Sequence, residues 1–238
     1  MAASHDSRLA ILTLVLVAFP AGAWNLGCQF SAERTASLDT TGAARVEVLA
    51  RAGDLTVRLS TGAAVTASGK ACASNEKYLA QSQVHVSRRG EVVQVVVQLP
   101  DEMKGFGIVY ASLDLTVDVP AGLPVDVTDS SGDVTIDKVR LVRLTDSSGD
   151  IVVRDVPGDI EINDSSGDIV VRGARDVVIP SDSSGDIVVA RVADSVRIES
   201  DTSGDVAISD VRKNVEFIAD SSGDVKVSGV KGTVKVPK

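Results

Sequence analysis

The chain has 238 residues, of which 33 are acidic and 24 are basic, so its net charge at pH 7 is −9. An acidic chain of this kind lacks the basic surface that DNA and RNA backbones require, which argues against a nucleic-acid partner. Hydrophobic residues make up 44% of the chain, but few are aromatic, and the abundance of valine and isoleucine favours strands over helices. Two histidines and two cysteines leave little material for histidine catalysis, a zinc site or a haem, so no cofactor is expected.

The first 23 residues have the features of a secretory signal peptide. Arg8 ends a short polar start, an apolar run extends from Leu9 to Phe19, and Ala21-Gly22-Ala23 supplies the small residues of a cleavage site. We expect cleavage before Trp24. The run of 11 apolar residues falls short of the roughly 20 needed to span a bilayer, which argues against an uncleaved membrane anchor. The mature chain is therefore expected to have no transmembrane segment. Export to the periplasm or out of the cell follows.

Cys28 and Cys72 are the two cysteines of the chain. An oxidising compartment lets such a pair close, and we predict a Cys28–Cys72 disulfide. The chain-entropy model gives about 4 kcal/mol for a closed loop of this length. The alternative is lipoprotein anchoring through Cys28 with Cys72 free, because Leu26-Gly27-Cys28 resembles the end of a lipoprotein signal, although Asn25 stands where that signal usually has leucine.

An internal repeat dominates the second half of the chain. The word Asp-Ser-Ser-Gly-Asp begins at six positions, with Thr202 replacing the first serine in the fifth copy: Asp129, Asp146, Asp164, Asp182, Asp201 and Asp220. Successive copies are 17 to 19 residues apart. A fixed period of this kind indicates one repeated structural unit.

Apolar residues alternate with outward residues after each copy, which is the pattern of a strand with one buried face. Each repeat has five inward positions, occupied in one copy by Ile187, Val189, Val192, Val196 and Ile198 and in the last copy by Val225, Val227, Val230, Val234 and Val236. One repeat cannot enclose a core alone, but stacked repeats can, with equivalent strands about 4.8 Å apart. The sequence therefore predicts an all-β, single-chain β-solenoid, similar to a parallel β-helix or β-roll, with coils of about 18 residues.

The region before the repeats is expected to be a less regular β cap of the same solenoid. Gly53-Asp54-Leu55-Thr56-Val57 echoes the start of each repeat strand, and strands are predicted at 84–87 and 92–99. No linker separates this part from the repeats. We therefore divide the chain into a signal peptide (1–23), an amino-terminal β region with the disulfide (24–110) and a continuous solenoid region (111–238).

Taken together, the exported start, Gly53–Val57, the turn Val119-Pro120-Ala121-Gly122-Leu123 and the serial Ser-Gly-Asp-Ile/Val strands resemble a bacterial family. That family is known as putative adhesins with β-strand repeats, a domain of unknown function, and the resemblance covers most of the mature chain. It implies the repeat fold and adhesin-like binding, and it assigns no chemistry to individual residues.

The glycine of each repeated word is predicted to occupy a turn position with positive φ. Stacking the aspartates that follow these glycines places like charges about 4.8 Å apart, with a repulsion of about 3 kcal/mol per pair before screening. Hydrogen bonds from serines and amides, or a row of bound calcium ions, could offset it. The repeat lacks the paired glycines of the calcium-binding β-roll, so we predict structural turns and no metal. The alternative cation site consists of Asp133, Asp150, Asp168, Asp186, Asp205 and Asp224.

The expected function is a non-catalytic exported scaffold or adhesin-like binding protein of the bacterial envelope, whose partner is an unknown envelope protein or polysaccharide. The alternatives are a calcium-binding repeat protein and a carbohydrate-active β-helix enzyme. Catalysis needs one distinctive constellation, whereas these carboxylates recur in every coil, and His85 lies in a predicted strand beside Arg88 and Arg89. The loop from Met103 to Gly107 is either a partner contact or a cap of the solenoid.

Overall fold

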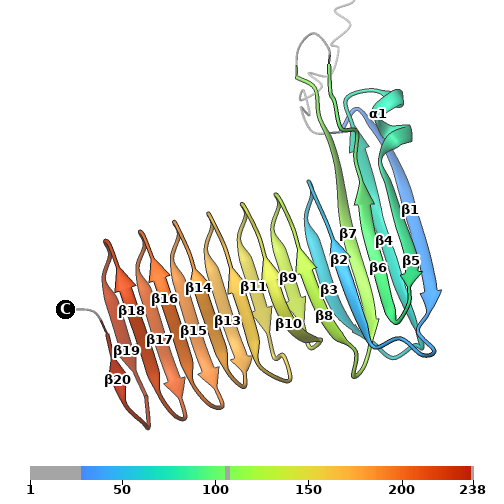
Figure 1. The fold of residues 1–238 in the computed structure, drawn as a ribbon. Helices are drawn as coiled ribbons and strands as arrows, with labels where there is room; N and C mark the ends of the chain where they lie inside the picture. Colours follow the sequence, from blue (N-terminus) through green and yellow to red (C-terminus); the bar gives the residue numbers. More distant parts are fainter. Residues whose placement is uncertain (1–27, 105–107, 237–238) are drawn as a thin grey trace, which may run out of the picture.

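The computed structural model describes residues 28–104 and 108–236. They form an elongated β-solenoid of two ten-stranded sheets (Figure 1). Sheet A contains, in spatial order, β1 (Phe30–Asp39), β4 (Ala64–Ala73), β7 (Ala111–Pro120), β3 (Leu55–Ser60), β9 (Val134–Asp137), β11 (Ile151–Arg154), β13 (Ile169–Ala174), β15 (Ile187–Val192), β17 (Val206–Val211) and β19 (Val225–Ser228). Sheet B contains β20 (Val234–Lys235), β18 (Val215–Asp220), β16 (Val196–Asp201), β14 (Val177–Ser181), β12 (Ile160–Asn163), β10 (Arg140–Thr145), β8 (Pro124–Thr128), β2 (Arg45–Leu49), β6 (Val92–Gln98) and β5 (Gln83–Arg89).

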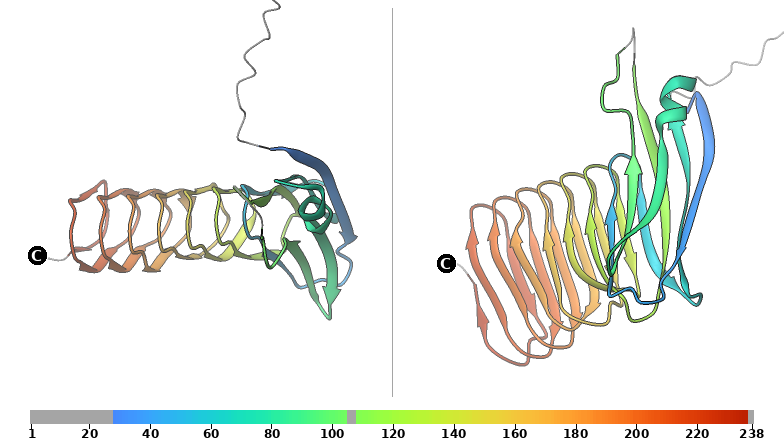
Figure 2. Two further views of the ribbon diagram at one scale, coloured as in Figure 1. Left: turned by 90° about the horizontal axis from the view of Figure 1, so that it is seen from above. Right: turned by 45° about the vertical axis from the view of Figure 1, so that its right-hand side comes forward.

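Each coil of the repeat region contributes one strand to each sheet. The Asp-Ser-Ser-Gly-Asp word connects a sheet B strand to the next sheet A strand along the edge drawn at the top of Figure 1, which we call the upper edge. A corner of variable length returns the chain to sheet B along the opposite, lower edge. Equivalent residues pair in parallel, as Ile151 does with Ile169 and Ile169 with Ile187. The predicted solenoid fold is therefore confirmed, with two flat faces (Figure 2).

The inward positions form one continuous core between the sheets. All five predicted positions of the coil that begins at Ile187 are at most 1% exposed. In the last coil the same prediction is wrong for Val234 and Val236, which are 47% and 42% exposed. They keep the inward offsets, but no further coil covers them within the described residues, so the end of the core remains open there.

The amino-terminal strands extend the solenoid in an order that differs from the chain order. β2 and β3 form one coil beside β8 and β9, and β6 and β7 form the next coil outward. β4 then pairs antiparallel between β1 and β7, and β5 pairs antiparallel with β6, which confirms the two predicted strands in this region. The short helix α1 (Glu76–Gln81) is an element that hydrophobic periodicity did not predict.

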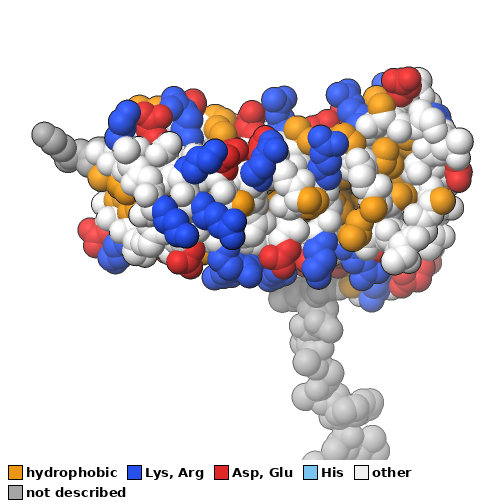
Figure 3. Space-filling model, turned by 90° about the horizontal axis from the view of Figure 1, so that it is seen from below, with side chains coloured by type: hydrophobic (Ala, Val, Ile, Leu, Met, Phe, Trp, Pro, Cys, Tyr) orange, Lys and Arg blue, Asp and Glu red, His pale blue; other side chains and the backbone are white. Residues whose placement is uncertain are grey.

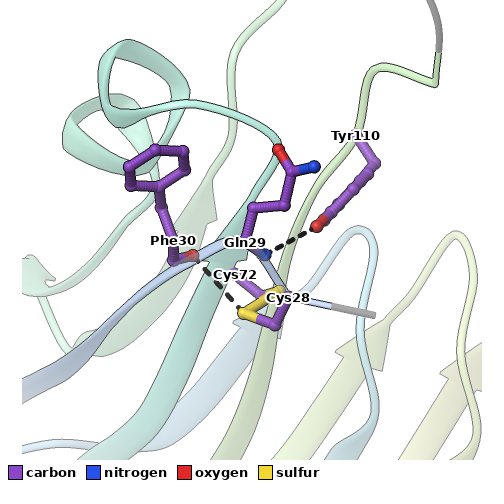
Figure 4. Close-up of a disulfide and its surroundings, with 5 residues drawn as sticks. All are labelled: Cys28, Gln29, Phe30, Cys72 and Tyr110. Atoms are coloured by element: carbon purple, nitrogen blue, oxygen red, sulfur yellow. Dashed lines mark hydrogen bonds between the residues drawn. A yellow bond between two sulfur atoms is a disulfide. The ribbon is translucent and has the colours of Figure 1, made fainter. Parts of the chain in front are cut away.

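A disulfide joins Cys28 to Cys72, as the sequence predicts, and ties the residues before β1 to β4 (Figure 4). Beside it, the Gln29 amide donates to the Tyr110 hydroxyl oxygen at 2.9 Å. The sulfur of Cys28 is thus already bonded, and a lipid thioether would require the disulfide to be absent. The expected signal peptide lies outside the described residues. No helix in 28–104 or 108–236 is long and apolar enough to cross a membrane.

Candidate functional site

A stack of glycines occupies the upper edge, one from each repeated word. Their φ angles lie between +116° and +139°, which confirms the predicted positive-φ turn. A Cβ on Gly185 would lie 2.5 Å from the carbonyl carbon of Gly167 and would overlap its oxygen. The Gly185 amide donates in turn to the Ser203 carbonyl at 3.1 Å. Both the backbone conformation and the close approach between coils therefore require glycine.

The aspartates that follow the glycines form an exposed row along the same edge, which we call the outer aspartates: Asp133, Asp150, Asp168, Asp186, Asp205 and Asp224. The structure brings together all six residues of the predicted alternative site. The first five carboxylates each accept a hydrogen bond from the backbone amide of the next aspartate, at 2.8 to 3.1 Å. Asp54 and Asp114 continue the row into the amino-terminal coils at 3.2 Å.

These hydrogen bonds supply one of the two expected means of offsetting the like-charge repulsion. A backbone amide that donates to a carboxylate stabilises its charged form, and here each coil provides one such amide to the carboxylate of the preceding coil. Among the described residues no three carboxylate, imidazole or thiol side chains gather into a group that could hold a metal ion. The absence of a specific calcium site stays a prediction, which a comparison of calcium with sodium can test.

A second row of carboxylates lies inside the solenoid, and sequence analysis missed its burial. These inner aspartates begin five of the repeated words and are 1 to 3% exposed: Asp129, Asp146, Asp164, Asp182 and Asp201. Neither carboxylate oxygen of Asp129 or Asp182 has a hydrogen-bond partner within the described part of the chain. The signal was available, because the alternation of Ile160 and Ile162 continues inward to Asp164.

Burial disfavours the charged form of the inner aspartates and raises their pKa values. The pKa rises to about 7 for Asp129 and Asp182 and to about 6 for Asp146, with burial as the largest cause and aspartates in adjacent coils as a smaller one. The pKa values of Asp164 and Asp201 are also raised, mainly by burial. The upper edge thus carries an exposed acidic row beside a buried acidic row whose pKa values are raised by burial.

The serines of the repeated word act in the turn itself. The second serine of a word donates its hydroxyl to a backbone carbonyl in the preceding coil. Ser166, for example, donates to the Ser147 carbonyl at 3.1 Å.

His85 lies on β5, the far edge strand of sheet B, with Nε2 3.1 Å from Gln98 Oε1. The one histidine of the expected mature chain is therefore placed away from the repeated serines.

The lower edge has the opposite charge character. The six words of the upper edge contain twelve aspartates and no basic residue, whereas the six lower corners, at 137–140, 154–159, 172–176, 190–195, 209–214 and 228–233, contain nine basic and six acidic residues. Seen from below, lysine and arginine side chains spread along most of the length of this edge (Figure 3). The solenoid is therefore electrically polarised across its width.

The loop between β6 and β7 is anchored to α1, at the top of the cap in Figure 1. The Tyr78 hydroxyl donates to the Lys104 carbonyl at 2.8 Å and lies 2.7 Å from the Lys104 amide. Met103 is 43% exposed and Ile108 is 73% exposed. Apolar atoms do face solvent beside this loop, whose residues 105–107 lie outside the described part of the chain, and its role as a partner contact stays a hypothesis.

A family model matches the chain over residues 39–194, about two thirds of its length. The match includes the β2–β3 coil, the amino-terminal cap from β4 onward and the first repeat coils. The chain belongs to the Toastrack DUF4097 family. Family membership agrees with the predicted repeat family of unknown function, and it accounts for the two-sheet solenoid.

Solved structures similar to this Toastrack protein include a putative cell adhesion protein from Clostridium sporogenes, with 10% identity, a TM-score of 0.42 and coverage of 87% of this chain and 100% of that chain. A putative lipid binding protein from Parabacteroides distasonis has 15% identity, a TM-score of 0.44 and coverage of 86% and 97%. A putative adhesin from Parabacteroides merdae has 15% identity, a TM-score of 0.44 and coverage of 87% and 96%. No curated protein matches the chain.

Proposed function

We propose that this Toastrack protein is a non-catalytic, exported scaffold that binds a component of the bacterial envelope, an envelope protein or a polysaccharide. The observation that carries the proposal is the repetition of one five-residue word along the whole upper edge, with the same contacts in successive coils. A catalytic centre needs one distinctive arrangement of groups, whereas this edge repeats a structural turn. The variable lower corners supply the distinctive side chains.

The proposal places the mature protein outside the cytoplasm, in the periplasm or beyond. Cleavage after residue 23 would leave an amino-terminal β region (24–110) and a solenoid region (111–238), with the Cys28–Cys72 disulfide tying β1 to the cap. A disulfide persists in oxidising compartments, which supports export. The alternative in which Cys28 carries a lipid would be recognised by a diacylglycerol-modified Cys28 at the mature amino terminus.

The test uses the mature chain, residues 24–238, and the insoluble envelope fraction of the producing bacterium. Co-sedimentation should show saturable retention of the protein, and the same incubation should release no new reducing sugar ends from the polysaccharides. Failure to co-sediment would contradict a binding scaffold. Sugar release that disappears when one carboxylate is replaced would establish the β-helix enzyme instead.

A further inference from the structure

Three hollows run along the lower edge, and a further hollow on the outer face of sheet B joins them through shared residues. This sheet B hollow, of about 650 Å³, lies over β2, β8 and β10 and shares Arg140 and Val142 with a second of about 290 Å³. The second shares Arg175 with a third of about 310 Å³, and the third shares Arg191 with a fourth of about 340 Å³ that reaches Arg212. Together they form one shallow groove parallel to the solenoid axis.

Corner length varies along the lower edge. Each corner lies between the last inward residue at the end of a sheet A strand and the first inward residue of the next sheet B strand. In most coils three residues separate these two, as between Val192 and Val196. One residue separates Val139 from Leu141, and two separate Ala174 from Val177. A register shift between Leu141 and Arg143 bends β10, and bulges of this kind redirect side chains.

Six arginines line the groove together with five carboxylates, those of Glu47, Asp126, Asp155, Asp159 and Asp210, so the arginines are in slight excess. We call this surface the arginine groove and define it by Arg140, Arg143, Arg175, Arg191 and Arg212. All five of these arginines are exposed, and Arg140 and Arg212 have no ion pair within the described residues. The side chains of Arg143, Arg175 and Arg191 are 58 to 60% exposed although each pairs with a carboxylate.

Existing ion pairs do not block an incoming anion. Arg191 lies 3.3 Å from Asp155, and Arg175 pairs with Asp159. Exposed pairs of this kind contribute little stability, and a guanidinium has five N–H donors, so it can keep one partner while it binds another carboxylate or phosphate. The same corners carry Arg154 and Arg172 outside the hollows, paired in register on sheet A and with no ion pair in the described residues.

The shape and composition of the groove select a class of ligand. From Arg140 to Arg212 the groove crosses five successive coils, so this stretch spans about 19 Å along the axis, which suits an extended polymer rather than a single small anion. No aromatic side chain of the described residues lines it, so nucleic-acid bases have no stacking surface there. The exposed apolar side chains are few and small, which does not suit insertion into a lipid surface.

We propose that the arginine groove binds a linear anionic polysaccharide, with carboxylate or phosphate groups of successive sugar units held by arginines of successive coils. The inference rests on the proposed envelope-binding function and names its site and the chemistry of its ligand. The acidic upper edge repels the same polymer, so the charge polarity of the solenoid orients the ligand on the lower edge.

The test measures binding of the mature chain to polygalacturonate, whose carboxylates are ionised at pH 7, and to its fully methyl-esterified form, which is uncharged. A groove variant combines Arg140→Gln, Arg175→Gln and Arg191→Gln. A control variant with the same charge change combines Lys70→Gln, Lys77→Gln and Arg89→Gln, three exposed residues of the amino-terminal cap. Circular dichroism melting curves establish that each variant is folded.

The expected result is that polygalacturonate binds, that its affinity falls as salt rises, and that the groove variant weakens binding about tenfold while the control changes it less than about twofold. The methyl ester should not bind. Equal loss in both variants, equal binding of the ester, or tighter binding to vesicles of anionic phospholipid than to polygalacturonate would overturn the inference. If the groove variant still co-sediments fully with the envelope fraction, this inference fails and the proposed scaffold function stands. If the unaltered chain does not co-sediment, the scaffold proposal itself fails.

Discussion

The two edges of the solenoid solve the same problem of reversing the chain in different ways. The upper edge uses nearly the same five-residue word in every repeat coil, whereas the lower corners vary in length and in their side chains. Gly167 and Gly185 pack backbone against backbone at the upper edge, so a Cβ has no room. A Cβ on Gly158 at the lower edge would meet no other atom within 4 Å. Close packing between coils thus requires glycine in every word of the upper edge, whereas the lower edge is open at Gly158 and packed at Gly232.

The largest expected effect contrasts a glycine from each edge. Gly185→Ala places a methyl group against the Gly167 carbonyl in a backbone of φ +127°, and we expect a loss of about 4 kcal/mol or more of unfolding free energy. Gly158 has φ +140° and open space around it, so Gly158→Ala introduces backbone strain but no clash and should lower the unfolding free energy by about 1 to 2 kcal/mol. Urea unfolding followed by circular dichroism measures both. Equal losses would mean that packing does not set the upper edge apart.

The inner aspartates predict an unusual dependence of stability on pH. The folded-state pKa values of Asp129, Asp146 and Asp182 are raised above the unfolded value near 3.9. Below about pH 4 these residues are protonated in both states and do not lower the free energy of unfolding, which falls as pH rises through about 6 to 7. Between pH 5 and pH 8 the melting temperature should fall. Asp182→Asn should remove part of this fall and stabilise the protein at pH 8 by about 2 kcal/mol.

Asp186→Asn is the matched control for this titration, because Asp186 belongs to the same word but is exposed. Burial is the main cause of the raised pKa of Asp182, and Asp164 and Asp201 in the adjacent coils raise it further, so their own titration should shift in the Asp182→Asn variant. Thermal melts of the unaltered chain and of both variants at pH 5, 6, 7 and 8 provide the measurement. A protein that is more stable at pH 8 than at pH 5 would contradict the claim that burial raises the pKa values of the inner aspartates. The pKa values of Asp39 and Asp159 are lowered by hydrogen bonds, so any loss of stability from them appears only in more acidic solution.

A smaller effect separates hydrogen bonding from calcium binding in the outer aspartates. Asp168→Ala removes the oxygen that accepts from the Asp186 amide at 2.8 Å and should cost about 1 kcal/mol, whereas Asp168→Asn keeps an acceptor and should cost less. Calcium and sodium at matched ionic strength should give the same melting temperature. Saturable binding of about one calcium per coil, lost in Asp168→Asn, would instead establish the cation site.

The smallest effect is expected at the lower edge. Arg175→Gln breaks an exposed ion pair with Asp159, and the unfolding free energy should change by less than about 1 kcal/mol. The measurement is urea unfolding at pH 7, with Arg197→Gln on the face of sheet B as a comparison, because Arg197 also pairs with exposed carboxylates. A loss of several kcal/mol on changing Arg175 would show that the lower corners hold the coils together.

The sequence by itself determined the solenoid, because the repeated word sets the coil length and alternation sets which side chains face inward. Ile187 and Val189 are buried and Val188 is not, as their spacing requires. Tertiary structure decided what depends on neighbours in space. The order in which β2–β3 and β6–β7 stack, the exposure of Val234, and the joining of corners into a groove follow from contacts between segments far apart in the chain. The inner aspartates lie between these cases: alternation points Asp164 inward, but the raised pKa values arise because stacking removes the whole row from water.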